Sequence, residues 1–213
     1  MVKPKAKQDS ENTPIITAIL SGDLEQALSL IDSGSNVNAP GRGGITPLMY
    51  ACSPPVLQLI VKLIEKGADV NTQDDNGRSA IFGAINSHDL ETVHYLISKG
   101  AKLNQTSKAG YTPLMTAVAS GDSSIVEYLI KNGADVNQKI KRPVSSEEIQ
   151  MMKMALKHFE SKEKGVKISS SSLEEIRAIV SGNVKEISAS ALEIAKRSNN
   201  REMIDLLISL GAK

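Results

Sequence analysis

The chain has 213 residues, a formal net charge of +1, and a composition that is 40% hydrophobic but only 3% aromatic. The balanced charge excludes a general electrostatic attraction to nucleic acid or to anionic membranes, and the single cysteine, Cys52, excludes an internal disulfide bond. With so few aromatic rings, the core must consist of aliphatic side chains, which suit stacked helices.

Residues 1–11 are polar, contain three lysines and are not followed by an apolar stretch. We therefore expect a disordered basic tail and no secretory signal. No apolar run in the chain approaches the roughly 20 residues that span a bilayer. These features predict no membrane partner and a cytoplasmic location, or the host cytosol if the chain is a secreted effector.

From residue 13 onward, one sequence motif recurs at 33-residue intervals, and two of its copies contain "TPLM". The copies begin at Thr13, Thr46, Ser79 and Thr112, and a fifth begins at Ser190, 78 residues after the fourth. Fixed offsets from each start carry the same residue: Ala at +5, Leu at +17, Ile at +18, Gly at +21 and, in the first four copies, Asn at +25. A period of this length indicates an array of stacked units.

Each copy predicts two helices joined by a short turn. The hydroxyl residue at its start is a helix N-cap, and the proline that follows it in three copies fits the first helical turn. The Leu–Ile pair belongs to the buried stripe of the second helix, and the glycine at +21 ends that helix. The tract 74–77 predicts a tight turn in an extended loop. No unit buries its apolar face alone, so the units share one continuous core.

The stretches "TPLMTAVASGD" and "YLIKNGADVN" within residues 112–137, with close copies in the other units, resemble the ankyrin repeat. The resemblance implies an all-α solenoid of stacked helix-turn-helix units with β-hairpin-like loops. It assigns repeats one to four to residues 12–138 and a C-terminal capping repeat to residues 189–213. Apolar residues replace the histidine that ankyrin repeats usually carry after "TPL", at Ile16, Met49, Phe82 and Met115. This column is either packing between repeats, the favoured interpretation, or a binding stripe.

Residues 139–188 interrupt the period. Two amphipathic helices are predicted there, within residues 145–161 and 171–182, each opened by a capping box (Ser145 with Glu148, and Ser171 with Glu174). The segment is either a degenerate, lengthened repeat that keeps the stack continuous or an inserted helical hairpin, and the first interpretation is favoured.

Residues 139–185 contain 10 basic and 6 acidic residues. The simplest interpretation is a solvated helix surface. The alternative is a docking patch for an acidic partner, formed by Lys139, Lys141, Arg142, Lys153 and Lys157. Nucleic acid is not an expected partner, because no aromatic residues are interleaved with these charges for base stacking.

No constellation of residues indicates catalysis, a cofactor or a metal. His88 and His94 are six residues apart, and neither they nor His158 join cysteines or carboxylates at metal-ligand spacing. Cys52 falls on the buried side of a predicted first helix, where a thiol is not a nucleophile. We therefore predict that the chain is not an enzyme.

The resemblance implies a protein partner bound on the concave side of the array, where loop tips and first helices project. A small-molecule ligand is not expected. Arg and Tyr are favoured interface anchors, so Arg42, Arg78 and Tyr111 are the strongest candidates. The full set of predicted partner-binding residues is Arg42, Ile45, Asp75, Asn76, Arg78, Asn86, Lys108, Tyr111 and Ser120.

The predicted function is a non-catalytic protein-binding scaffold. The alternatives are a regulatory or substrate-recruiting subunit of an enzyme, and a pathogen effector or toxin-neutralising protein.

Overall fold

The computed structural model describes residues 12–143, 146, 149–154, 177–181 and 186–213. The chain divides into two compact units. Residues up to 138 and residues 190–213 belong to the first, and residues 139–189 belong to the second. The predicted tail, residues 1–11, lies outside the described residues.

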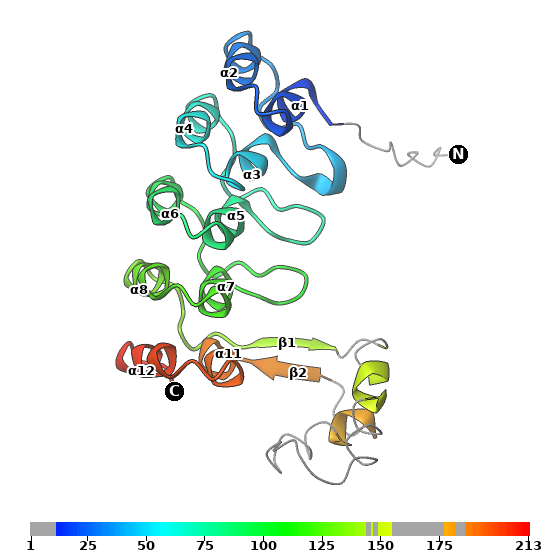
Figure 1. Cartoon of the computed structure of the whole chain (residues 1–213), viewed down its shortest axis with the longest axis vertical. Helices are drawn as coiled ribbons and strands as arrows, with labels where there is room; N and C mark the ends of the chain where they lie inside the picture. The colour runs from blue at the N-terminus through cyan, green and yellow to red at the C-terminus, as the bar shows by residue number, and fades with distance from the viewer. Residues whose placement is uncertain (1–11, 144–145, 147–148, 155–176, 182–185) are drawn as a thin grey trace, which may run out of the picture. The chain divides into compact units, whose positions relative to one another are not determined.

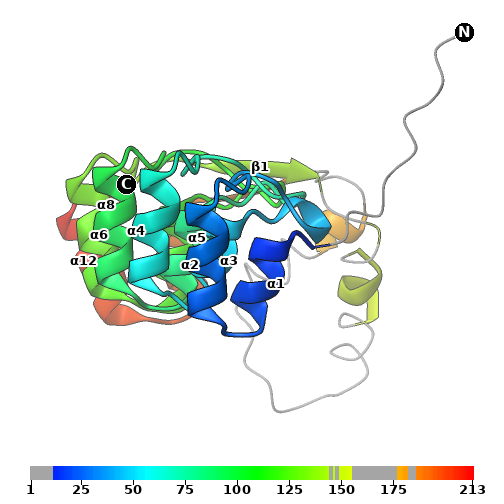
Figure 2. The same ribbon diagram turned by 90° about the horizontal axis from the view of Figure 1, so that it is seen from above.

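The first unit is a stack of helix pairs (Figure 1). The pairs are α1 (Pro14–Leu20) with α2 (Leu24–Asp32), α3 (Pro47–Ala51) with α4 (Leu57–Glu65), α5 (Ala80–Asn86) with α6 (Leu90–Ser98), α7 (Pro113–Ser120) with α8 (Ser123–Lys131), and α11 (Ala191–Arg197) with α12 (Arg201–Ser209). A short 3-10 turn, η1 (Arg42–Gly44), lies in the first loop. The first helices of the pairs form an inner column, the second helices form an outer column, and the loops project from the inner column (Figures 1 and 2). This arrangement is the predicted all-α solenoid.

The hydroxyl residues of the repeated motif stand at the N-caps of the first helices, and all but Ser79 accept a side-chain cap hydrogen bond as predicted. The Thr13, Thr46 and Thr112 hydroxyls each accept the backbone N–H three residues on, at 3.1–3.3 Å. In the last repeat, Ser190 accepts from the Glu193 N–H at 3.3 Å and the Glu193 carboxylate accepts from the Ser190 N–H, which forms a capping box. The motif therefore marks the residue at which each helix pair begins.

The core lies between successive second helices and between successive first helices. Leu63, Leu96 and Leu129, at offset +17, are fully buried, as the Leu column predicts. Leu30 at the same offset in the first repeat is only half-buried, while Ile208, at +18 in the last repeat, is 54% exposed. Each end of the array thus leaves one position of the Leu–Ile pair less covered than in the inner repeats, where Ile64, Ile97 and Ile130 are half-buried.

The apolar column on the first helices is buried in all four repeats. Ile16, Met49, Phe82 and Met115 are at most 9% exposed. This burial agrees with packing between repeats, the favoured interpretation of this column, although Phe82 and Met49 also line cavities. Met49 also takes over a polar role, because its sulfur lies 3.5 Å from the Thr46 backbone N–H.

A ladder of asparagines at offset +25 ties each repeat to the next. The side-chain N–H of each asparagine donates to the backbone carbonyl of the glycine that ends the second helix of the next repeat. The side-chain oxygen accepts the backbone N–H of the residue two positions after that glycine. All of these bonds are 2.8–3.1 Å long. Asn137 of the fourth repeat makes these bonds to Gly211 and Lys213, and α11 packs against α7 as α7 packs against α5. The last repeat therefore stacks directly on the fourth.

The second unit begins as a lengthened hairpin loop. Strand β1 (Ile140–Pro143) pairs antiparallel with β2 (Glu186–Ala189), with Ile140 opposite Ala189. The shorter loops close at the same two offsets, through N–H···O bonds of 2.9 Å such as Asp74 to Arg78 and Ser107 to Tyr111. Residues 141–188 thus replace a three-residue loop tip. Insertion accounts for this arrangement, and the favoured interpretation as a degenerate repeat of the stack does not.

Only parts of the two helices predicted in this segment are described. Residues 149–154 and 177–180 are helical. Ile179 is buried, whereas Met151 and Met154 are more than 60% exposed. Both predicted capping boxes and Lys157 lie outside the described residues.

Removing the last rung of the asparagine ladder should loosen the C-terminal repeat. Asn137→Ala deletes two hydrogen bonds between repeats, and we expect a loss of about 1–3 kcal/mol in the free energy of unfolding, measured by urea denaturation. Asn132→Ala is the control, because the Asn132 amide bonds only the Tyr128 carbonyl of its own helix. Equal losses for the two variants would contradict the role of the ladder in joining repeats.

Candidate functional site

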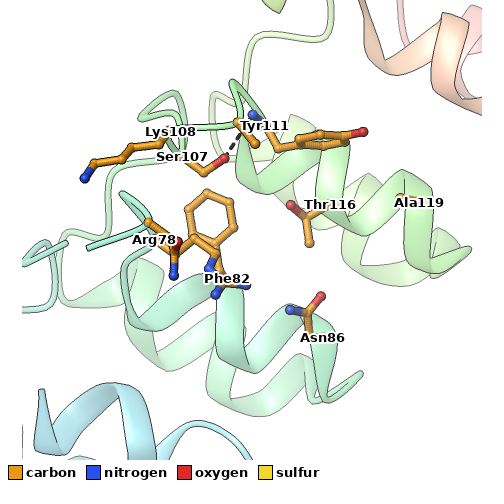
Figure 3. Close-up of a pocket in the computed structure, with 10 residues that line it drawn as sticks. Arg78, Phe82, Asn86, Ser107, Lys108, Tyr111, Thr116 and Ala119 are labelled. Atoms are coloured by element: carbon orange, nitrogen blue, oxygen red, sulfur yellow. Dashed lines mark hydrogen bonds between the residues drawn. The ribbon is translucent and has the colours of Figure 1, made fainter. Parts of the chain in front are cut away.

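Two adjoining cavities lie on the inner side of the first unit, where the first helices meet the loops. The larger has a volume of about 460 Å³ and opens between the third and fourth repeats (Figure 3). Its lining comes from two loops and two helices: Asn76, Arg78, Ser107, Lys108, Ala109 and Tyr111 from the loops, and Phe82, Asn86, Thr116 and Ala119 from α5 and α7.

The smaller cavity, of about 230 Å³, lies between the second and third repeats. It shares Arg78, Phe82 and Asn86 with the larger one, so the two adjoin, and together they are here called the inner groove. Gly83 lines the smaller cavity at the position where the neighbouring repeats carry Tyr50 and Thr116. A Cβ at Gly83 would lie 3.3 Å from the Cys52 carbonyl oxygen and 3.5 Å from the Ser53 Cβ, so the missing side chain lets the third repeat approach the second closely.

Backbone hydrogen bonds between successive loops hold the walls of the groove. The Lys108 N–H donates to the Asn76 carbonyl, and the Asp75 N–H donates to the Gly43 carbonyl, both at 2.7 Å. Within the third loop, the Asp74 carboxylate accepts the N–H groups of Asn76 and Arg78 at 2.8 Å. The loop tips are thus cross-linked to each other before any partner arrives.

An aromatic pair forms the apolar part of the larger cavity. Phe82 is 3% exposed, and its ring points from α5 toward the loop that carries Ser107 (Figure 3). Tyr111 is 36% exposed at the rim, and its backbone N–H donates to the Ser107 hydroxyl at 3.1 Å. One ring therefore supplies a floor and the other a side wall open to solvent.

The charges that line the larger cavity are both positive. The Arg78 Nε lies 3.6 Å from the Asp74 carboxylate, with the Arg78 side chain 49% exposed and that of Asp74 only 6% exposed. Lys108 is exposed and makes no ion pair with any residue that the structure describes. No acidic residue lines this cavity, so its rim presents a guanidinium and an ammonium to an incoming group.

The structure gathers some of the predicted binding residues and leaves others apart. Asn76, Arg78, Asn86, Lys108 and Tyr111 line the larger cavity, and Ile45 lines the smaller. The remaining three line neither: Arg42, Asp75 and Ser120.

Of those three, Arg42 and Asp75 are exposed on the loops, and the Ser120 hydroxyl donates to the Thr116 carbonyl of its own helix. The partner-binding role of all nine residues stays a prediction. Phe82 belongs to the column that the sequence offered as a possible binding stripe. Gly83 was missed, and the signal available was its small size where the neighbouring repeats carry Tyr50 and Thr116.

Cys52, which was considered as a possible nucleophile, lies in the core. Cys52 is fully buried, as predicted, and its burial raises the pKa of the thiol to about 12, so the thiolate is not present at neutral pH.

Each of the two described histidines contacts a residue of the fourth repeat. His88 contacts Asp122 at 3.1 Å and His94 stacks on Tyr128 at 3.7 Å. Within the described ranges, no three potential ligands gather as a metal site; His158 falls outside them. No described helix is both long and apolar enough to cross a bilayer.

Comparison with known proteins agrees with the stacked geometry. A search of curated proteins gave no match. The family model for ankyrin repeats in three copies matches residues 2–74 and 55–140, which together cover about two thirds of the 213 residues. The last repeat lies beyond this match but continues the same helix pairing and the same asparagine ladder. The chain belongs to the ankyrin-repeat family.

Proposed function

We propose that this chain is a non-catalytic scaffold, located in the cytoplasm, that binds a partner protein through its inner groove. Ankyrin repeats are generally protein–protein interaction modules. The observation that carries the proposal for this chain is the pair of adjoining cavities across the second to fourth repeats, lined by exposed Arg78, Lys108 and Tyr111 over a buried Phe82.

The mechanism of binding is preorganisation. The loops that form the groove are already joined by backbone hydrogen bonds, and Phe82 is already packed. A partner therefore meets a surface that loses little conformational entropy on association. Arg and Tyr side chains on such a surface combine apolar contact with directional hydrogen bonds, which makes them common anchors. The alternatives raised from the sequence, an enzyme's regulatory subunit or an effector, concern the identity of the partner and would use the same groove.

The test compares a groove variant with a matched variant of the outer helices. Arg78→Ala with Tyr111→Ala removes one cation and one ring from the groove, whereas Lys99→Ala with His94→Ala removes one cation and one ring from exposed positions on the outer side. Once a partner has been captured by affinity purification and identified by mass spectrometry, its dissociation constant is measured for each variant by calorimetry.

We expect the groove variant to bind about tenfold more weakly or worse, which corresponds to about 1.4 kcal/mol. The outer variant should bind like the unaltered chain. Circular dichroism melting curves check that both variants are folded, because the outer variant loses the stacking of His94 on Tyr128 and the groove variant loses the contact of Arg78 with Asp74. Binding that is unaffected by the groove variant but weakened by the outer variant would overturn the proposal.

A further inference from the structure

We infer that the larger cavity receives an acidic peptide segment of the partner, in which one large apolar side chain is flanked by carboxylates. This inference rests on the proposed function and names the chemistry of the partner that the same groove would take. It is drawn from three features of the cavity: the sign of its charges, the polar groups left unpaired at its rim, and the aromatic surface at its centre.

In the first four repeats, acidic and basic residues are divided unevenly between the loop tips and the remaining surface. Residues 12–138 contain 12 acidic and 8 basic residues. The inner helices α1, α3, α5 and α7 contain none of them. The loop tips hold two of the acids (Asp74 and Asp75) and three of the bases (Arg42, Arg78 and Lys108), which leaves ten acids and five bases elsewhere. An acidic segment is therefore repelled by most of the surface and attracted to the loop side.

The two loop-tip acids do not cancel the positive charge of the larger cavity. Asp74 is almost fully covered and its carboxylate already accepts two backbone N–H groups and faces the Arg78 Nε. Asp75 lines neither cavity. Within the described residues, the one ion pair of Arg78 engages Nε, which leaves both terminal Nη nitrogens as donors. The Arg78 Nη groups and the Lys108 ammonium can therefore both donate hydrogen bonds to a ligand.

The larger cavity offers an apolar surface beside these donors. The Phe82 ring forms the floor, and Ala109, Tyr111 and Ala119 line the sides. Figure 3 shows Arg78 and Lys108 on one side of the Phe82 ring and Tyr111 on the other. A volume of about 460 Å³ accepts a leucine or phenylalanine side chain together with part of its backbone.

The ligand that matches both features is an extended segment with a bulky side chain over Phe82. Its neighbouring carboxylates would accept hydrogen bonds from Arg78 and Lys108. The smaller cavity continues the path past Phe82 toward Tyr50 and Ser53, so the segment would run across the repeats rather than along one helix. A basic or a purely polar segment lacks the charge complement.

The test selects binders from a phage-displayed random peptide library on the full chain. We expect the selected peptides to combine Asp or Glu with a neighbouring Leu, Ile, Phe or Met. A synthetic peptide of the selected sequence is then titrated by fluorescence anisotropy against the unaltered chain, against Arg78→Ala with Lys108→Ala, and against the control Lys99→Ala with Lys131→Ala, which removes the same charge from exposed outer positions. Circular dichroism melting curves check that each variant is folded.

The groove double variant should weaken binding by roughly tenfold or more, the outer double variant should not, and added salt should weaken binding to the unaltered chain. Replacing the peptide's acids by Gln, or its bulky residue by Ala, should each reduce affinity. Selection of basic or uncharged peptides, selection of none, or binding indifferent to Arg78→Ala with Lys108→Ala would overturn the inference. If such peptides still lose affinity on Tyr111→Ala, the groove remains a binding site and only its acidic preference is wrong.

Discussion

Leu129→Ala is expected to lower the free energy of unfolding by about 2–5 kcal/mol, because truncating a fully buried leucine removes its transfer free energy and leaves a cavity between neighbouring helices. Leu129 lies at offset +17 of the fourth repeat, which has a stacked repeat on each side. The measurement is equilibrium unfolding in urea, followed by circular dichroism.

The chain supplies its own control for this truncation. Leu30 occupies the same offset in the first repeat, but it is only half-buried because it lies at the end of the stack. Leu30→Ala should therefore cost clearly less than Leu129→Ala, and Ile208→Ala, at a residue that is 54% exposed, should cost little. If all three truncations had the same effect, the leucine column would not be the core between stacked repeats.

Gly77→Ala is expected to destabilise the chain by about 2–5 kcal/mol, from two causes that act together. Gly77 has a φ of +72°, a conformation that costs an alanine about 1–2 kcal/mol. A Cβ there would also lie 2.8 Å from the Lys108 backbone nitrogen, and relieving that overlap adds about 1–3 kcal/mol. Because Lys108 must shift, the variant should also weaken partner binding.

Gly34→Ala separates the two causes. Gly34 has a φ of +87°, but no other atom lies within 4 Å of the place that a Cβ would take, so this variant carries the backbone strain without the overlap. We expect it to cost about 1–2 kcal/mol and to leave binding unchanged. Thermal unfolding and calorimetric titration with the partner check both variants. A Gly77→Ala chain as stable as Gly34→Ala would show that the loops are not in close contact.

Most of the fold follows from the 33-residue period, because each constant residue performs the same local task in every unit. Thr46 and Thr112 cap helices that begin with Pro, and the glycine at +21 ends the second helix with a positive φ in each repeat, as at Gly67 and Gly100. These interactions are local in sequence, so the pattern predicts them directly. The asparagine column is visible too, but its bonds join residues about 30 positions apart, and the pattern alone does not reveal their partners.

The favoured interpretation of residues 139–188 is wrong because periodicity does not say which units are in contact. Amphipathic helices within residues 145–161 and 171–182 are compatible with either a repeat or a hairpin, and local patterns do not separate the two. The deciding contacts come from the flanking sequence, where Asn137 reaches Gly211 and Ile140 pairs with Ala189. A loop closed at its usual offsets tolerates a long insertion because the cost of loop closure grows slowly with length.

The candidate site is predictable in part. The exposed members, such as Arg78 and Tyr111, stand at loop positions that the repeat leaves free, and the sequence places them on one side. The groove itself depends on three-dimensional detail that a column of residue types does not contain. It arises where the Phe82 ring lies under the neighbouring loop (Figure 3) and where loops and first helices of successive repeats leave a space between them. Arg42 and Ser120 share the general location but line neither cavity.

The central claim is that the partner occupies the inner groove, and hydrogen–deuterium exchange of the free and bound chain tests it most directly. The account predicts slower exchange on binding at the loops 74–78 and 107–111 and at the adjoining helices α5 and α7, with little change in α4, α6 and α8. Protection confined to the outer helices, with the two loops exchanging as in the free chain, would contradict it.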